Sequence, residues 1–182
     1  MINRSSLFTG IWYDTTKLLT KQIPKIGVAF STRLDELGYT KFEKLRNARA
    51  TDIEMVCNRQ SPFGDEFMNF VNKVPDYELK IKQTAISSEL FKADLIVSIK
   101  LTNHLNRPEG NSWLISGDEE NSLLFAKKIP VTMFDTDDHT IEFEYQVNRV
   151  KNGLLTFNLI NEFVVGCDKL VTFTPVYKNI VK

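Results

Sequence analysis

The spacing of apolar residues changes near Pro75, and this change restricts the chain to a helical part followed by a β part. Before Pro75 the apolar residues recur at helical spacing, and after it they alternate with polar residues. The net charge also changes, from +3 over residues 1–75 to −3 over residues 76–182. We therefore predict an α+β chain with two domains, a helical subdomain at 1–75 and an all-β domain at 76–182.

The helical part is predicted to hold five helices. They are expected at 5–21, at 28–37, from Lys41, after Thr51 and at 63–72. Thr40 and Thr51 each stand three residues before a glutamate, the spacing of a capping box, so both are predicted N-caps. In the second helix, Val28, Phe30, Leu34 and Leu37 are expected to face the core, and Gly38 is expected to follow its end.

The second part is predicted to hold seven strands in about 105 residues. They are expected around 77–81, 95–101, 113–116, 123–129, 141–147, 155–159 and 170–176. Asn152-Gly153 is typical of a hairpin turn. This number of short strands predicts an immunoglobulin-like or fibronectin-III-like sandwich, with Trp113 in its core.

Several classes of protein are excluded by composition and by missing motifs. Lys and Arg number 23, as do Asp and Glu, so the whole chain is neither strongly basic nor strongly acidic. No apolar run is long enough for a transmembrane helix, and the N-terminus lacks a signal-peptide pattern, so we expect no membrane partner. The two cysteines, 110 positions apart, fit reduced thiols.

Catalytic and metal-binding patterns are also missing. The sequence has no P-loop, G-x-S-x-G, H-E-x-x-H or paired C-x-x-C motif. Asp135, Asp137 and Asp138 lack the spacing of a calcium loop and are interpreted as a solvated loop. We therefore expect a binding chain that is not itself an enzyme and holds no cofactor or metal.

The most informative local motif is Ile23-Pro24-Lys25-Ile26-Gly27, a tight turn between two predicted helices. A helix-hairpin-helix uses such a turn to present backbone amides to a nucleic-acid phosphate. The predicted nucleic-acid-binding residues are Lys21, Lys25, Gly27 and Arg33. The alternative is an ordinary pair of packed helices, and Lys25 stands where a DNA-binding hairpin usually has glycine.

Loop residues of the β part are candidates for binding a protein partner. Arg107, Arg149 and Lys151 occupy predicted turns of the sandwich, where recognition residues are common. Pro62-Phe63-Gly64 is interpreted as structural, with Pro62 starting a helix and Phe63 fixing that start to the core.

Longer stretches resemble a known family. Residues 11–13, 21–27 and 37–45 look like the helical part of the Sec-sixty-three-type module of Ski-two-like helicases. Asn58-Arg59-Gln60-Ser61-Pro62-Phe63-Gly64, followed by Val74-Pro75-Asp76-Tyr77-Glu78-Leu79, is similar to the "NR-x-x-PFG … LPKYEL" pattern of the crossover-promoting helicases of the Mer-three kind. Residues 113–118 and 159–166 resemble strands of the same module.

The resemblance implies that the chain is the C-terminal part of a nuclear, ATP-dependent meiotic DNA helicase whose ATP and magnesium site lies outside it. The sandwich would then dock a protein partner, such as a MutL-homologue heterodimer or another recombination protein. Two alternatives stay open. The helical part could be an accessory DNA-binding module, or the whole chain could be a structural brace for the motor lobes.

Overall fold

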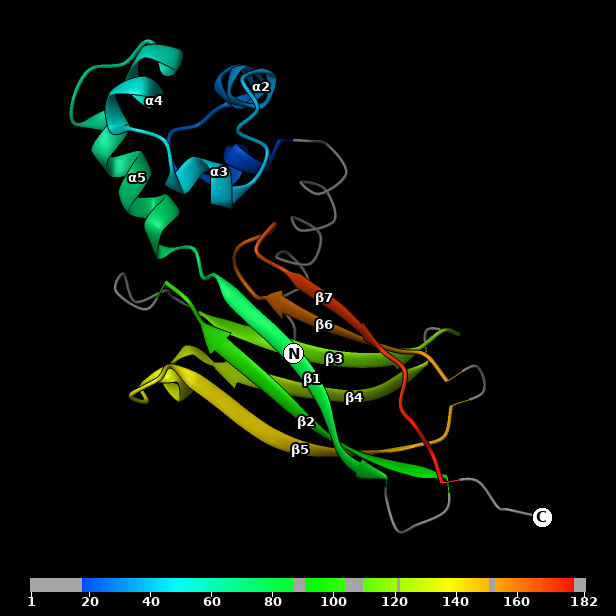
Figure 1. Ribbon diagram of the computed structural model, residues 1–182. Helices are drawn as coiled ribbons and strands as arrows, with labels where there is room; N and C mark the ends of the chain where they lie inside the picture. Colours follow the sequence, from blue (N-terminus) through cyan, green and yellow to red (C-terminus); the bar gives the residue numbers. More distant parts are fainter. Residues whose placement is uncertain (1–17, 87–90, 104–109, 121, 151–152, 179–182) are drawn as a thin grey trace. The chain divides into compact units, whose positions relative to one another are not determined.

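The computed structural model describes residues 18–86, 91–103, 110–120, 122–150 and 153–178 (Figure 1). The chain is α+β and forms two compact units. The first unit comprises the described parts of Met1–Pro75, Asn103–Gly110 and Asn161–Cys167. The second comprises those of Asp76–Thr102, Asn111–Ile160 and Asp168–Lys182.

The first unit is helical. Its elements are the 3₁₀ helix η1 (Leu19–Gln22) and the α-helices α2 (Val28–Glu36), α3 (Phe42–Arg46), α4 (Ala50–Cys57) and α5 (Phe63–Lys73). Most of the helix predicted at 5–21 lies outside the described residues, and its described end is η1. The helix predicted at 63–72 is confirmed as α5.

The end of α2 follows the prediction, but its inward face is shorter than expected. Gly38 has φ +86°, and the amides of Gly38 and Tyr39 donate to carbonyls of α2 in the pattern of a Schellman motif. Leu34 is fully buried, whereas Val28 and Leu37 are 53% and 61% exposed. The inward prediction for these two was wrong because Val28 is the first helical residue and Leu37 follows the last.

The two predicted threonine caps were also wrong. Thr40 lies one residue before Lys41, the N-cap of α3, and Thr51 lies inside α4, whose N-cap is Arg49. Neither helix has a side-chain hydrogen bond at its N-cap. The capping-box spacing is present in the sequence, but Lys41 and Arg49 hold the extended backbone that an N-cap needs.

Helices α4 and α5 approach each other closely at Gly64. A Cβ atom on Gly64 would lie 2.2 Å from the carbonyl oxygen of Ala50, so only glycine fits there. The amide of Gly64 donates to Oε1 of Glu54 at 2.9 Å. Pro62 is the N-cap of α5 and Phe63 packs partly against the helical core, which agrees with the structural interpretation of this segment.

A segment distant in sequence completes the helical unit. Gln22 and Val165 exchange two hydrogen bonds of 3.0 Å, one from the side-chain amide to the carbonyl and one from the backbone amide to Oε1. Asn161 holds the same segment in a turn, because its Oδ1 accepts from the amides of Phe163 and Val164. Cys167 is buried in the helical core.

The second unit contains two antiparallel sheets. The strands are β1 (Tyr77–Ile86), β2 (Lys92–Leu101), β3 (Asn111–Asp118), β4 (Leu123–Pro130), β5 (Thr140–Asn148), β6 (Leu155–Asn161) and β7 (Lys169–Phe173). One sheet has the order β1-β2-β5 and the other β4-β3-β6-β7 (Figure 1). A short 3₁₀ helix, η3 (Val131–Phe134), follows β4.

Side chains from both sheets share one core, as the alternation predicted. The inward set includes Leu95, Val97, Ile99, Leu101, Ile141, Val147, Leu155, Phe157 and Leu159. Trp113 is an exception to the prediction, because Leu114 faces the core and Trp113 is half-buried on the other face of β3. There it lies opposite Lys128, whose ammonium is 5.9 Å from the indole ring.

Candidate functional site

The turn between η1 and α2 is fixed by its two isoleucines. Ile23 and Ile26 are buried, and the amide of Ile26 donates to the carbonyl of Ile23 at 3.1 Å. Lys25, between them, is exposed and has φ +67°. Lys25 therefore adopts the left-handed conformation that glycine provides most easily.

The four predicted nucleic-acid-binding residues do not form one cluster. Lys21 lies in η1, and Lys25 and Gly27 lie at the turn, where Gly27 is the N-cap of α2. Helix α2 has no acidic residue in its first turn and no side-chain cap. Arg33 is exposed near the other end of α2, about 9 Å further along the helix axis.

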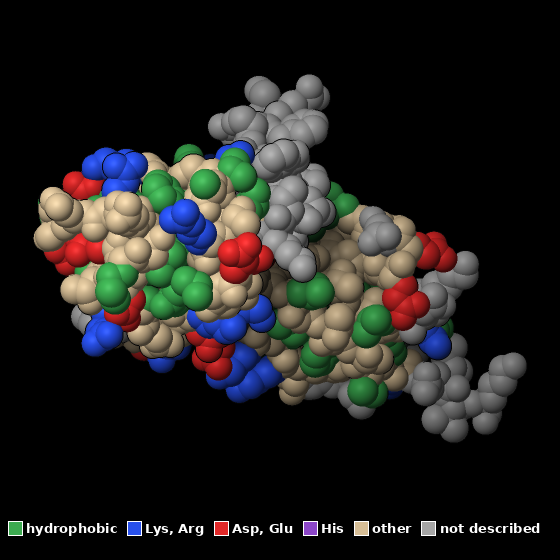
Figure 2. Space-filling model, turned by 90° about the horizontal axis from the view of Figure 1, so that it is seen from above, with side chains coloured by type: hydrophobic (Ala, Val, Ile, Leu, Met, Phe, Trp, Pro, Cys, Tyr) green, Lys and Arg blue, Asp and Glu red, His purple; other side chains and the backbone are tan. Residues whose placement is uncertain are grey.

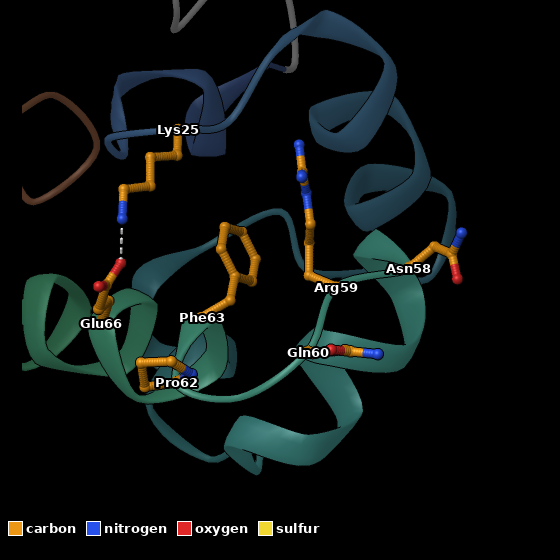
Figure 3. Close-up of a pocket in the computed structure, with 7 residues that line it drawn as sticks. All are labelled: Lys25, Asn58, Arg59, Gln60, Pro62, Phe63 and Glu66. Carbon is orange, nitrogen blue, oxygen red and sulfur yellow. Dashed lines mark hydrogen bonds and ion pairs between the residues drawn. The ribbon is translucent and has the colours of Figure 1, made fainter.

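Lys25 also lines an open recess of about 720 Å³ in the helical unit (Figure 3). The other lining residues come from the loop after α4 and the start of α5: Asn58, Arg59, Gln60, Pro62, Phe63 and Glu66. Asn58 ends α4 in the left-handed conformation, with φ +48°, and the amide of Arg59 then donates to the carbonyl of Glu54. This geometry turns the chain so that Arg59 and Phe63 face the same recess.

Charged and aromatic groups are combined in this recess. Nζ of Lys25 lies 2.5 Å from Oε2 of Glu66, and both side chains remain more than half exposed. The Arg59 guanidinium lies 5.5 Å from the centroid of the Phe30 ring. In Figure 3 the ring of Phe63 stands between Lys25 and Arg59.

Arg59 and Arg33 also act on one buried group. Burial raises the pKa of the Cys57 thiol, and the positive charges of Arg59 and Arg33 oppose that rise. Both guanidinium groups are therefore close enough to Cys57 for their fields to reach it.

Sequence reasoning did not place Arg59 and Phe63 in a recess. It used residues 58–64 as part of the family resemblance and interpreted Pro62-Phe63-Gly64 as structural, with no binding role for either residue. A usable signal was present in the closeness of Arg59, Gln60 and Phe63 at the break between α4 and α5. No local sequence pattern indicates that Lys25 lines the same recess, because Lys25 lies more than thirty positions before the loop that begins at Asn58.

Among the predicted partner-binding residues, only Arg149 falls in the described part of the chain; Arg107 and Lys151 lie outside it. The exposed Arg149 guanidinium lies 5.9 Å from the centroid of the Phe91 ring. The Arg149 amide donates to the Phe91 carbonyl at 2.7 Å. Phe91 is 44% exposed and has φ +64°, an unusual conformation for an aromatic residue.

The surface of the chain carries mixed charge. On the face shown in Figure 2, cations are interspersed with carboxylates and apolar side chains. Among the described residues, no cluster of three His, Cys, Asp or Glu side chains could hold a metal ion. Within the same residues, no helix has the length and apolarity needed to cross a membrane.

The acidic loop at 135–138 has a local structural role. Oδ1 of Asp138 accepts a hydrogen bond from the Thr140 amide at 3.1 Å. This hydrogen bond is the main cause that lowers the pKa of the Asp138 carboxyl, and hydrogen bonds to the hydroxyl groups of Thr136 and Thr140 lower it further. The carboxylate therefore holds the turn before β5.

Comparison with known proteins adds a second line of information. No protein-family model matches the chain. A solved structure of the protein named ApaA from Bordetella pertussis is 11% identical, covers 59% of this chain and 99% of that one, and has a TM-score of 0.27, which is too low to support an argument.

Curated proteins give stronger matches. The chain is 30% identical over 172 residues to "Probable ATP-dependent DNA helicase HFM1" of Mus musculus, covering 91% of this chain and 12% of the mouse protein. It is 28% identical to the HFM1 protein of Xenopus tropicalis, covering 93% and 13% respectively. It is 26% identical to "ATP-dependent DNA helicase MER3 homolog" of Oryza sativa, covering 92% and 14%. The chain is therefore homologous, over about nine-tenths of its length, to a segment that forms 12–15% of the HFM1 and MER3 helicases.

Proposed function

We propose that the chain is a non-catalytic, C-terminal interaction module of a nuclear ATP-dependent DNA helicase that acts in meiotic crossover recombination. The support is the homology to HFM1 and MER3 proteins, of which the chain spans only 12–15%. A helicase motor needs a P-loop and two motor lobes, and the sequence contains no P-loop motif. ATP hydrolysis is therefore assigned to the remainder of the longer protein.

The proposal includes a finer description of both units. A three-stranded sheet of order β1-β2-β5 facing a four-stranded sheet of order β4-β3-β6-β7 supports an immunoglobulin-like sandwich of the fibronectin-III type. The left-handed Lys25 in the turn between η1 and α2 supports a helix-hairpin-helix arrangement, because the lysine takes the conformation of the usual glycine.

The observation that supports docking of a protein partner is the exposed pair of Arg149 and Phe91. Arginine and aromatic side chains are enriched among residues that contribute most to protein–protein binding. A phenylalanine that is 44% exposed in a left-handed conformation contributes little to folding, so a role in recognition gives a reason for its presence. The proposed partner is a MutL-homologue heterodimer.

The test is capture of a purified MutL-homologue heterodimer by the immobilised full chain. We expect Arg149→Glu to reduce capture at least tenfold without lowering the melting temperature. Lys82→Glu is the matched control, because Lys82 is an exposed cation on the three-stranded sheet. Equal capture by the wild type and both variants would contradict docking at Arg149.

A second candidate function is contact with nucleic acid through the hairpin turn. Lys25 and the uncapped N-terminus of α2 favour it, since both offer positive charge or free amides at the same turn. Fluorescence anisotropy with labelled DNA should then show binding that weakens steeply with salt. No binding at about 50 mM salt would remove this candidate.

A further inference from the structure

The recess described above extends the second candidate function, on which this inference rests. We propose that this recess binds one nucleotide of a single-stranded nucleic acid, with the base against Phe63 and the neighbouring phosphates at Arg59 and Lys25. Its volume of about 720 Å³ falls in the range of small-ligand sites, roughly 300–1,000 Å³. The recess is open, so a continuous strand can enter and leave it.

Phe63 provides the surface for the base. It is only partly buried, although it begins α5, and its ring faces the cavity between two cations (Figure 3). Every base has an aromatic face, so stacking on phenylalanine binds any sequence, and it contributes about 1–3 kcal/mol per base in single-strand-binding proteins. Bases in a duplex present no free face to such a ring.

Arg59 and Lys25 provide the positive charge on either side of the ring. Both members of the ion pair between Lys25 and Glu66 are exposed to solvent: 64% of the Lys25 side chain and 51% of the Glu66 side chain are accessible. Exposed ion pairs of this kind contribute about 0–1 kcal/mol, so a phosphate can compete with Glu66 for Lys25. The Arg59 guanidinium lies 5.5 Å from the centroid of the Phe30 ring, within the range of a cation–π contact, and this contact helps to hold it in place.

Carboxamides complete the lining. Asn58 and Gln60 are exposed at the edge of the recess, and each offers both a donor and an acceptor to a base edge. Because a carboxamide carries both a donor and an acceptor, it can hydrogen-bond to the edge of any base. The combination of an aromatic ring, two cations and two carboxamides fits a nucleotide better than an acidic peptide, which would not need the exposed ring.

The test compares a fluorescein-labelled single-stranded oligonucleotide with a duplex of the same sequence, using the full chain and fluorescence anisotropy. We expect Phe63→Leu to weaken single-strand binding by roughly 5- to 150-fold, the factor that corresponds to one lost stacking contact. Phe63→Tyr keeps an aromatic ring at this position and should therefore bind the single strand about as tightly as the wild type does. Arg59→Gln should reduce the slope of log K against log salt by about 0.7.

Two control variants separate the recess from general surface effects. Phe163→Leu removes an aromatic ring that is 63% exposed in the same unit but does not line the recess. Lys44→Gln removes an exposed lysine of α3. We expect Phe163→Leu to leave single-strand affinity unchanged and Lys44→Gln to change it less than Arg59→Gln does. Thermal unfolding of each variant checks that its fold is retained.

Photo-crosslinking gives a measurement that does not depend on any substitution. An oligonucleotide carrying bromodeoxyuridine should crosslink to the tryptic peptide Gln60–Lys73, which contains Phe63. Crosslinking only to peptides outside 58–73 would overturn the proposal.

The outcomes of these experiments are distinguishable. Equal binding of single strand and duplex that is insensitive to Phe63→Leu would exclude the recess but leave phosphate contact by the hairpin intact. Competition by polyglutamate as strong as competition by the oligonucleotide would also overturn the assignment. Absence of any binding at low salt would exclude both nucleic-acid functions without affecting partner docking at Arg149.

Discussion

The carboxylate of Glu54 on α4 accepts a hydrogen bond from the backbone amide of Gly64 at 2.9 Å, so one helix caps the next. Glu54→Ala should destabilise the protein by about 0.5–2 kcal/mol, because the amide loses its acceptor and the N-terminus of α5 loses a nearby negative charge. Glu54→Gln should lose less, since its carbonyl oxygen can still accept.

Urea denaturation followed by circular dichroism measures this effect. Glu36→Ala is the control, because Glu36 is exposed at the end of α2. An equal loss of stability in Glu36→Ala and Glu54→Ala would show that the cap contributes nothing.

The close approach of α4 and α5 predicts that Gly64 tolerates no side chain. Alanine has the higher helix propensity, by about 1 kcal/mol, yet its Cβ would lie 2.2 Å and 2.6 Å from the carbonyl group of Ala50. The clash should outweigh the propensity, so we expect Gly64→Ala to cost about 1–3 kcal/mol.

Gly27→Ala provides the comparison for that substitution. A Cβ there meets nothing within 4 Å, and φ is −89°, so the cost should stay below about 1 kcal/mol. A Gly64→Ala protein as stable as the wild type would mean that the helices can separate without cost.

A substitution at Phe91 should weaken binding of the protein partner without lowering the stability of the fold. Its left-handed backbone costs about 1–2 kcal/mol for most residues, and asparagine tolerates this conformation better. Phe91→Asn should therefore leave the melting temperature unchanged or raise it, while capture of the partner falls because the aromatic contact with Arg149 is lost. A large drop in melting temperature would instead show that the ring has a structural role.

The buried thiol predicts an effect of alkaline pH. Burial raises the pKa of Cys57 in the folded protein above its value in the unfolded chain. The stabilisation is therefore complete below the ordinary thiol pKa of about 8.5 and is lost as the pH rises through the folded-state value. We expect the free energy of unfolding to fall above pH 8.5, with a slope of at most about 1.4 kcal/mol per pH unit from this group.

Cys57→Ala should remove that component of the slope. The measurement belongs below pH 9.5 or so, because burial also raises the pKa of Tyr145 and Tyr177, which ionise at higher pH. An unchanged slope in Cys57→Ala would assign the pH dependence to other groups.

The strands were predictable because their alternation is strong. Val97 and Ile99 in β2, and Phe157 and Leu159 in β6, face the core as their spacing indicated. The prediction that Trp113 lies in the core was wrong because Trp113, Leu114 and Ile115 are all apolar. The sequence alternation therefore cannot show whether Leu114 or its two neighbours face the core. The register with β4 decides this, and register is a tertiary property.

The helical unit was less predictable because its details depend on contacts distant in sequence. The capping-box spacing at Thr40 and Thr51 was a local signal, but neither threonine is an N-cap in the structure. The recess depends on Lys25 and Phe63 meeting from two separate segments. Nothing local marks Val165 as the hydrogen-bonding partner of Gln22, since the two residues are 143 positions apart.

The pairing of Gln22 with Val165 bears on how this protein can be divided. A fragment ending at Pro75 would lack the described parts of Asn103–Gly110 and Asn161–Cys167, which belong to its compact unit. Leu19, which a Cβ on Gly166 would meet at 2.3 Å, would then be left without its covering backbone. Expressing the helices and the sandwich as separate pieces should therefore yield aggregation-prone halves, and a stable minimal fragment has to keep both in one polypeptide.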